Sequence, residues 1–75
     1  MNLNKLVIMK EDPYEGIKTL AWRVSRSEGF KLSLPKSMIL WNTKNKQLAL
    51  PQWLFDKNQS YFSTLAQRGK CKVVS

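Results

Sequence analysis

The chain has no histidine and only one cysteine, Cys71, among its 75 residues. Histidine is the usual general base near neutral pH, so its absence excludes Ser-His and Cys-His catalytic pairs. A single cysteine forms no internal disulfide and, without histidine, supplies no zinc site. We therefore expect a protein that is not an enzyme and that carries no metal or cofactor.

Glycine and carboxylate are scarce as well. The three glycines stand apart from one another, so the chain has no glycine-rich phosphate loop. Three of the five acidic residues, Glu11, Asp12 and Glu15, lie close together in one short stretch. A magnesium site in a nuclease would be expected to draw ligands from separate elements, so we interpret this stretch as a helix cap or an acidic loop.

Long apolar runs are also absent. The longest, residues 6–9 and 38–41, have four residues each. A membrane-spanning helix needs about 20 apolar residues and a signal peptide about 7 to 15. We expect a soluble, cytoplasmic protein with no membrane partner, folded as one domain over residues 1–75.

Against these absences stands a large excess of positive charge. Thirteen Lys and Arg face five Asp and Glu, for a net charge of +8. Most of the excess follows residue 28, because residues 29–75 hold eight cations and one acid. A field of this sign attracts polyanions. The expected partner is nucleic acid or, as the alternative, an acidic surface of a host protein; the oligomeric state stays open.

The N-terminal third contains one clear strand and one ambiguous segment. Residues 3–10 are rich in Leu, Val, Ile and Met, and are too short for a typical helix, so they predict a strand. In residues 13–28, Asp12, Pro13 and Glu15 suit the start of a helix. If that segment is helical, the fold becomes a ferredoxin-like β-α-β-β-α-β arrangement.

A hairpin is the other interpretation of residues 13–28, and we favour it. Apolar and polar residues alternate on both sides of a Ser27-Glu28-Gly29 turn, as paired strands require. The core face of this hairpin would hold Leu20, Trp22, Val24, Phe30, Leu32 and Leu34. The opposite, solvated face would hold Arg23, Lys31 and Ser33.

Prolines and a polar turn organise the middle of the chain. Short alternating strands end at Pro35 and at Pro51, because proline cannot donate a hydrogen bond to a sheet. The polar stretch 42–46 predicts a turn that carries Lys44 and Lys46.

The C-terminal third has the apolar spacing of a helix over residues 52–67. Residues 56–60 are weak helix formers, so we expect the helix to break there into two. Gly69 is a suitable terminator. Residues 70–75 are interpreted either as a last short strand or as a frayed end. The predicted fold is mainly β (α+β), with three to five antiparallel strands in a small sheet or barrel and a C-terminal helix.

Two short segments frame the polar turn: Leu34-Pro35-Lys36-Ser37 before it, and Leu50-Pro51-Gln52-Trp53-Leu54 after it. This order of a strand end, a hairpin and a helix start resembles that of small phage-encoded, mainly β domains, over about a third of the chain. The resemblance implies a mainly β domain from a mobile genetic element, and it assigns no activity.

Cations interleaved with aromatic residues are typical of small modules that bind nucleic acid through phosphates and stacked bases. The predicted nucleic-acid-binding residues are Arg23, Arg26, Lys31, Lys36, Lys44, Lys46, Arg68, Lys70 and Lys72. Trp41 and Tyr61 are the candidates for stacking, whereas Trp53 is interpreted as a core anchor at the helix start. The predicted function is non-enzymatic binding of nucleic acid; the alternative is an inhibitor that blocks a host protein such as a polymerase or a defence nuclease.

Overall fold

The computed structural model describes residues 2–25 and 30–74 of the chain. Its elements, in chain order, are β1 (Lys5–Met9), β2 (Tyr14–Glu15), β3 (Thr19–Arg23), β4 (Lys31–Pro35), the 3-10 helix η1 (Lys36–Met38), β5 (Leu40–Asn42), β6 (Gln47–Leu50), α1 (Gln52–Lys57), α2 (Gln59–Gln67) and β7 (Cys71–Val73). The predicted mainly β fold with a C-terminal helix is confirmed.

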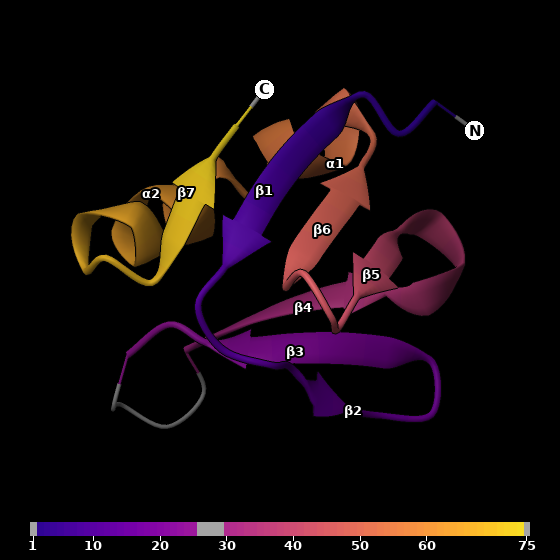
Figure 1. The fold of residues 1–75 in the computed structure, drawn as a ribbon, viewed down its shortest axis with the longest axis horizontal. Helices are drawn as coiled ribbons and strands as arrows, with labels where there is room; N and C mark the ends of the chain where they lie inside the picture. The colour runs from indigo at the N-terminus through magenta and orange to yellow at the C-terminus, as the bar shows by residue number, and fades with distance from the viewer. Residues whose placement is uncertain (1, 26–29, 75) are drawn as a thin grey trace.

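The strands form two antiparallel sheets, and neither closes into a barrel (Figure 1). The four-stranded sheet has the order β5-β6-β1-β7, and the three-stranded sheet has the order β2-β3-β4. The described strands outnumber the predicted three to five because the two-residue strand β2 was not anticipated, and because β7 was one of two interpretations of residues 70–75. Such short strands leave little alternation in a sequence.

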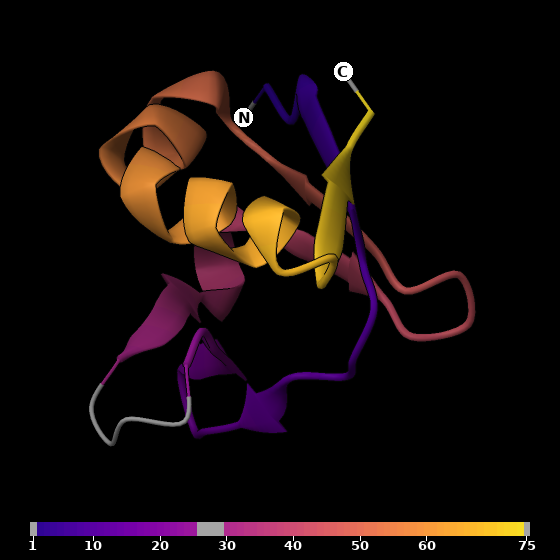
Figure 2. The same ribbon diagram turned by 90° about the vertical axis from the view of Figure 1, so that its left-hand side faces the viewer.

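The two sheets and the helices surround one core. Strands β3 and β4 run across the end of the four-stranded sheet (Figure 1), and α1 and α2 cover one face of that sheet (Figure 2). No described element covers its other face. None of the helices within residues 2–25 and 30–74 combines the length and hydropathy needed to cross a membrane.

Alternation along the strands decides which side chains enter the core. In β1, Val7 and Met9 are buried, whereas Ile8 between them is exposed. In β4, Leu32 and Leu34 are buried beside exposed neighbours. The helices add Leu54, Phe55, Phe62 and Leu65. Because successive side chains of a strand point to opposite faces, each sheet has one face buried in the core and one face exposed to solvent.

The hairpin interpretation of the N-terminal half is confirmed. β3 pairs with β4, so that Leu20 faces Leu34 and Trp22 faces Leu32. The described part of residues 13–28 contains β2 and β3 and no helix, which removes the ferredoxin-like alternative. The predicted Ser27-Glu28-Gly29 turn lies outside the described residues.

One predicted core residue of the hairpin, Phe30, differs from expectation. It lies just before β4 and is 39% exposed. Its ring packs on Tyr61 of α2, with the ring centres 5.1 Å apart. Phe30 therefore contacts the margin of the core, although Val24, whose N–H donates to the Phe30 carbonyl oxygen at 3.0 Å, is fully buried.

The predicted helix and its break are also confirmed. Pro51 precedes α1, and the helix is interrupted at Asn58, whose side-chain amide donates to the Leu54 carbonyl oxygen at 3.0 Å. Gly69 follows α2 with a φ of 69°, a left-handed conformation that glycine adopts without strain. Residues 71–73 form β7 and are not frayed.

Trp53 is not a core anchor, so that prediction is wrong. Its side chain is 53% exposed, whereas Leu54 and Phe55, the next two residues, are buried. Consecutive helical residues are turned by about 100° from each other. With Leu54 and Phe55 directed at the core, Trp53 is directed to the surface.

Candidate nucleic-acid interface

The three-stranded sheet has an outer face that is turned away from the core. Pairing places Tyr14 opposite Ala21, and Ala21 opposite Ser33. In the next position along β3 on this face, Arg23 lies opposite Lys31. One exposed aromatic ring and two small side chains thus lie beside a pair of exposed cations.

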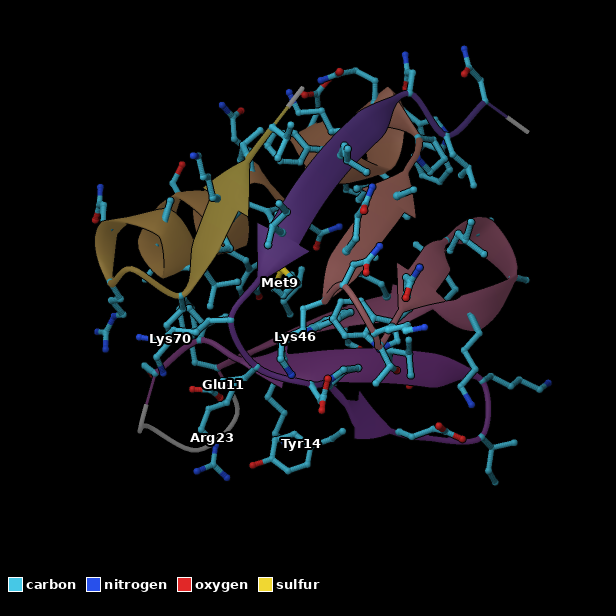
Figure 3. All side chains as sticks on the ribbon, viewed as in Figure 1. Met9, Glu11, Tyr14, Arg23, Lys46 and Lys70 are labelled. Carbon is cyan, nitrogen blue, oxygen red and sulfur yellow. The ribbon has the colours of Figure 1, made fainter. Side chains whose placement is uncertain are left out.

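Tyr14 and Arg23 contact each other on this face. The Arg23 guanidinium lies 5.7 Å from the centre of the Tyr14 ring, within the range of a cation–π interaction. The Tyr14 side chain is nevertheless 58% exposed. Both side chains project away from the four-stranded sheet (Figure 3), so the ring and the charge are presented together to solvent.

Arg23 and Lys31 have the same charge and occupy directly opposed positions. Like charges in such positions destabilise a sheet. The ion pairs of the described residues are Lys36 with Glu15 at 3.3 Å and Lys46 with Asp12 at 3.1 Å, and they involve neither Arg23 nor Lys31. An anion bound across Arg23 and Lys31 would offset their repulsion.

A second group of lysines surrounds the end of β1. The backbone N–H of Lys10 donates to the Lys70 carbonyl oxygen at 2.9 Å. Lys72 on β7 lies opposite Ile8, on the exposed face of the four-stranded sheet. Lys46 approaches from the other side, where its carbonyl oxygen accepts from the Met9 N–H at 2.7 Å. Its ammonium group is paired with Asp12.

The two groups meet where the sheets adjoin. Arg23 and Lys70 line the same narrow gap, and Glu11 lies beside them (Figure 3). The Glu11 carboxylate lowers the local positive charge, but Arg23 and Lys70 line the same gap. We use the name cationic strip for the residues that run around this corner from one sheet to the other: Lys31, Arg23, Lys70, Lys10 and Lys72.

The structure does not gather all of the predicted cations. Lys36 lies at the opposite end of the β3–β4 ladder from Lys31 and is paired with Glu15. Lys44 is in the turn between β5 and β6, next to Lys46, as predicted. Arg68 is exposed at the end of α2. Arg26 lies outside the described residues. The strip thus contains Arg23, Lys31, Lys70 and Lys72 of the nine predicted cations.

Both predicted stacking residues pack partly against the core of the domain. Trp41 packs edge-on against the buried Trp22, with ring centres 5.2 Å apart. Tyr61 packs on Phe30. Each of these rings is half-buried against the core, and less of it is open to a base than in Tyr14.

Sequence reasoning did not single out Lys10 and Tyr14. Lys10 lies in the nearly neutral N-terminal third, and Tyr14 belongs to the segment that also suited a helix. The positions of both depend on pairing: Tyr14 with Ala21, and Lys10 with Lys70. A two-residue strand such as β2 leaves too short a pattern to be found in a sequence.

In the acidic stretch, Glu11 and Asp12 lie in the loop between β1 and β2, Glu15 lies on β2, and the carboxylates of Asp12 and Glu15 have different partners. Asp12 pairs with Lys46, and Glu15 pairs with Lys36. The backbone carbonyl of Glu11 accepts a hydrogen bond from the Trp22 indole at 3.0 Å. In residues 2–25 and 30–74, no three Asp, Glu, Cys or His side chains form a group suited to a metal ion.

The Cys71 thiol is half-buried on β7 and donates to the Phe62 carbonyl oxygen at 3.6 Å. Burial raises the pKa of this thiol, because the thiolate would lose its hydration. A protonated thiol is a weak nucleophile and a weak metal ligand, so Cys71 is suited to packing between β7 and α2.

No protein-family model, no curated protein sequence and no solved structure matches this chain.

Proposed function

We propose that this chain is a non-enzymatic module that binds nucleic acid through the cationic strip. The observation that carries the proposal is the placement of Arg23 opposite Lys31, next to the exposed ring of Tyr14. Two like charges held together on a folded surface attract a polyanion more strongly than two separated charges. The net charge of +8 adds long-range attraction.

Phosphate contacts supply the affinity in this mechanism. Lys and Arg side chains that neutralise phosphates release counterions, and this term does not depend on base sequence. The cations of the strip have long, exposed or half-buried side chains on strands or strand ends. Such contacts position a nucleic acid without selecting its sequence, so little sequence preference is expected.

A salt titration with a matched control tests the proposal. Fluorescence anisotropy would follow a labelled 12-nucleotide strand against the protein at several salt concentrations. The strip variant carries both Arg23→Gln and Lys31→Gln. The control variant carries both Lys18→Gln and Lys57→Gln. Both double variants remove two charges, but Lys18 and Lys57 lie outside the strip. For a single strand, the slope of log association constant against log salt concentration should be about −0.7 for each phosphate contacted.

The strip variant should bind more weakly and lose roughly 1.4 from that slope, for two contacts at about 0.7 each. The control variant should change both quantities much less. Binding that is absent or insensitive to salt would overturn the proposal. Equal losses in the two variants would show that net charge alone, and not the strip, attracts the ligand.

A phage or other mobile element is the proposed origin of the module, with action in the cytoplasm of the host. Support comes from the two segments that resemble phage-encoded domains. In the fold each segment leads from a strand into a helix: residues 34–37 from β4 into η1, and residues 50–54 from β6 into α1.

A second candidate function is supported by the uncovered face of the four-stranded sheet. Pairing aligns Leu40, Ala49 and Leu6 across this face, and the Val74 N–H donates to the Leu6 carbonyl oxygen at 2.8 Å. Leu40 is 62% exposed. Lys72 lies on this face opposite Ile8, and the four strands of the sheet carry no carboxylate. An acidic host-protein surface with an apolar centre is complementary to this face.

Capture experiments separate the two candidates. The module and its variants would be used as bait in host-cell lysate with and without nuclease treatment. A protein that is lost with Leu40→Asp, but retained with the double strip variant, favours the inhibitor. Capture that nuclease treatment abolishes favours nucleic acid.

A further inference from the structure

We infer that the outer face of the three-stranded sheet is a stacking platform for single-stranded nucleic acid, with Tyr14 as the residue that receives a base. This inference rests on the proposed function and narrows its ligand to strands with unpaired bases. Arg23 and Lys31 would hold the phosphates next to the stacked base.

The Tyr14 ring is open to a ligand. It lies on β2, an edge strand that pairs only with β3, and it is 58% exposed. Among the described residues, Arg23 is the side chain placed over the ring, at 5.7 Å. A base can therefore approach the ring on the side away from Arg23, while the guanidinium stays beside the stack.

The side chains in the same row as Tyr14 on this face are small. Ala21 lies directly opposite Tyr14, and Ser33 lies opposite Ala21 on the following strand. Both side chains are small, so a planar base lying over the sheet meets no bulky residue in this row. Paired strands lie about 4.8 Å apart, so the row from β2 to β4 spans roughly 10 Å.

The cations form the next row of the same face. Arg23 follows Ala21 by two residues on β3, and Lys31 precedes Ser33 by two on β4. A nucleic-acid strand that crosses the sheet from β2 toward β4 thus meets the Tyr14 ring first, with the positive charges of Arg23 and Lys31 beside it. Sheets that combine stacking aromatics with flanking cations suit single-stranded ligands.

The exposed ring discriminates between ligand classes. In a duplex each base face is covered by its neighbours, so a side chain on an outer surface cannot stack on it without unpairing. Unpaired bases have free faces. The cations alone would bind either form, and Tyr14 is the feature that favours the single strand.

The test compares three probes of equal length: a 12-nucleotide single strand, an abasic strand with the same phosphates, and a duplex. The proteins are the wild type, Tyr14→Phe, which keeps the ring, and Tyr14→Leu, which removes it at similar size. Wild type and Tyr14→Phe should bind the single strand about 5- to 150-fold more tightly than the abasic strand. Tyr14→Leu should lose most of that preference and keep its affinity for the abasic strand. Circular dichroism confirms that each variant is folded.

The outcomes separate this inference from the proposed function. Salt-dependent binding that is equal for the base-bearing and abasic strands overturns the platform and leaves the cationic strip intact. A preference for the duplex, or a base preference that survives in Tyr14→Leu, also overturns it. No binding to any probe overturns both the platform and the function on which it rests.

Discussion

Arg23 and Lys31 lie directly opposite each other on β3 and β4, with both side chains exposed. Opposed like charges lower the stability of a sheet, typically by a few tenths of a kcal/mol up to about 1 kcal/mol. The domain therefore carries a small local cost at the place where the proposed ligand would bind. Residues selected for stability alone would pair opposite charges at these positions.

Replacing Lys31 by Glu should make the domain more stable and a weaker binder. The new carboxylate would face Arg23 and form a cross-strand ion pair worth about 0.2–1 kcal/mol. Urea unfolding measures the first effect, and anisotropy with a single-stranded oligonucleotide measures the second. The control Lys57→Glu makes the same charge change on α1, where it should bring no such gain in stability. A loss of stability in Lys31→Glu would contradict the opposed-charge argument.

Leu32 and Leu40 should respond very differently to replacement by Ala. Leu32 is fully buried in the core, whereas Leu40 is exposed on the outer face of β5. Leu32→Ala should lower the free energy of unfolding by about 2–5 kcal/mol, and Leu40→Ala by less than about 0.5 kcal/mol. Urea unfolding of both variants checks this difference. Similar losses in the two would mean that the face around Leu40 is covered in solution.

Gly69 should resist replacement because of its backbone conformation. Its φ is 69°, and no heavy atom lies within 4 Å of a Cβ added there, so crowding contributes nothing. The left-handed conformation should cost Gly69→Ala about 1–2 kcal/mol of unfolding free energy. Gly69→Asn should cost less, because Asn tolerates this region better. Thermal unfolding of the two variants shows which is the more stable. Equal stability of Gly69→Ala and wild type would contradict the prediction.

The Cys71 thiol should make stability fall in alkaline solution. Burial raises the pKa of the thiol in the folded protein, so the folded state holds this proton more tightly than the unfolded chain does. The contribution is fully present below the unfolded thiol pKa and is lost as pH rises through the folded pKa. Urea unfolding of wild type and Cys71→Ala across this range isolates the effect, since other groups titrate alike in both. A difference independent of pH would argue against it.

Local patterns were sufficient for much of the fold. The alternation of Leu20, Trp22 and Val24 predicted the β3–β4 hairpin, and the helical break and Gly69 were found from residue preferences. These features depend on interactions between residues near in sequence. Trp53 was misplaced because a helix start does not by itself say which side of the helix meets the core.

The candidate site was less predictable for a physical reason. Arg23 and Lys31 were expected on one solvated face, because a hairpin relates them locally. Tyr14 was missed because β2 has only two residues and leaves no alternation to detect. Lys10 reaches the site through a pairing with Lys70, which is far from it in sequence, and packing of the whole domain brings such distant residues together.

By itself, the sequence determined the surplus of positive charge, the absence of histidine, and the alternation that makes one side of each strand apolar, because composition and nearest neighbours decide these. Only the tertiary structure decided that Lys70 and Arg23 lie together, that Lys36 and Lys46 are paired with carboxylates, and that Tyr14 is open to solvent. Strand order and register place such distant residues, and they follow from packing the domain as a whole.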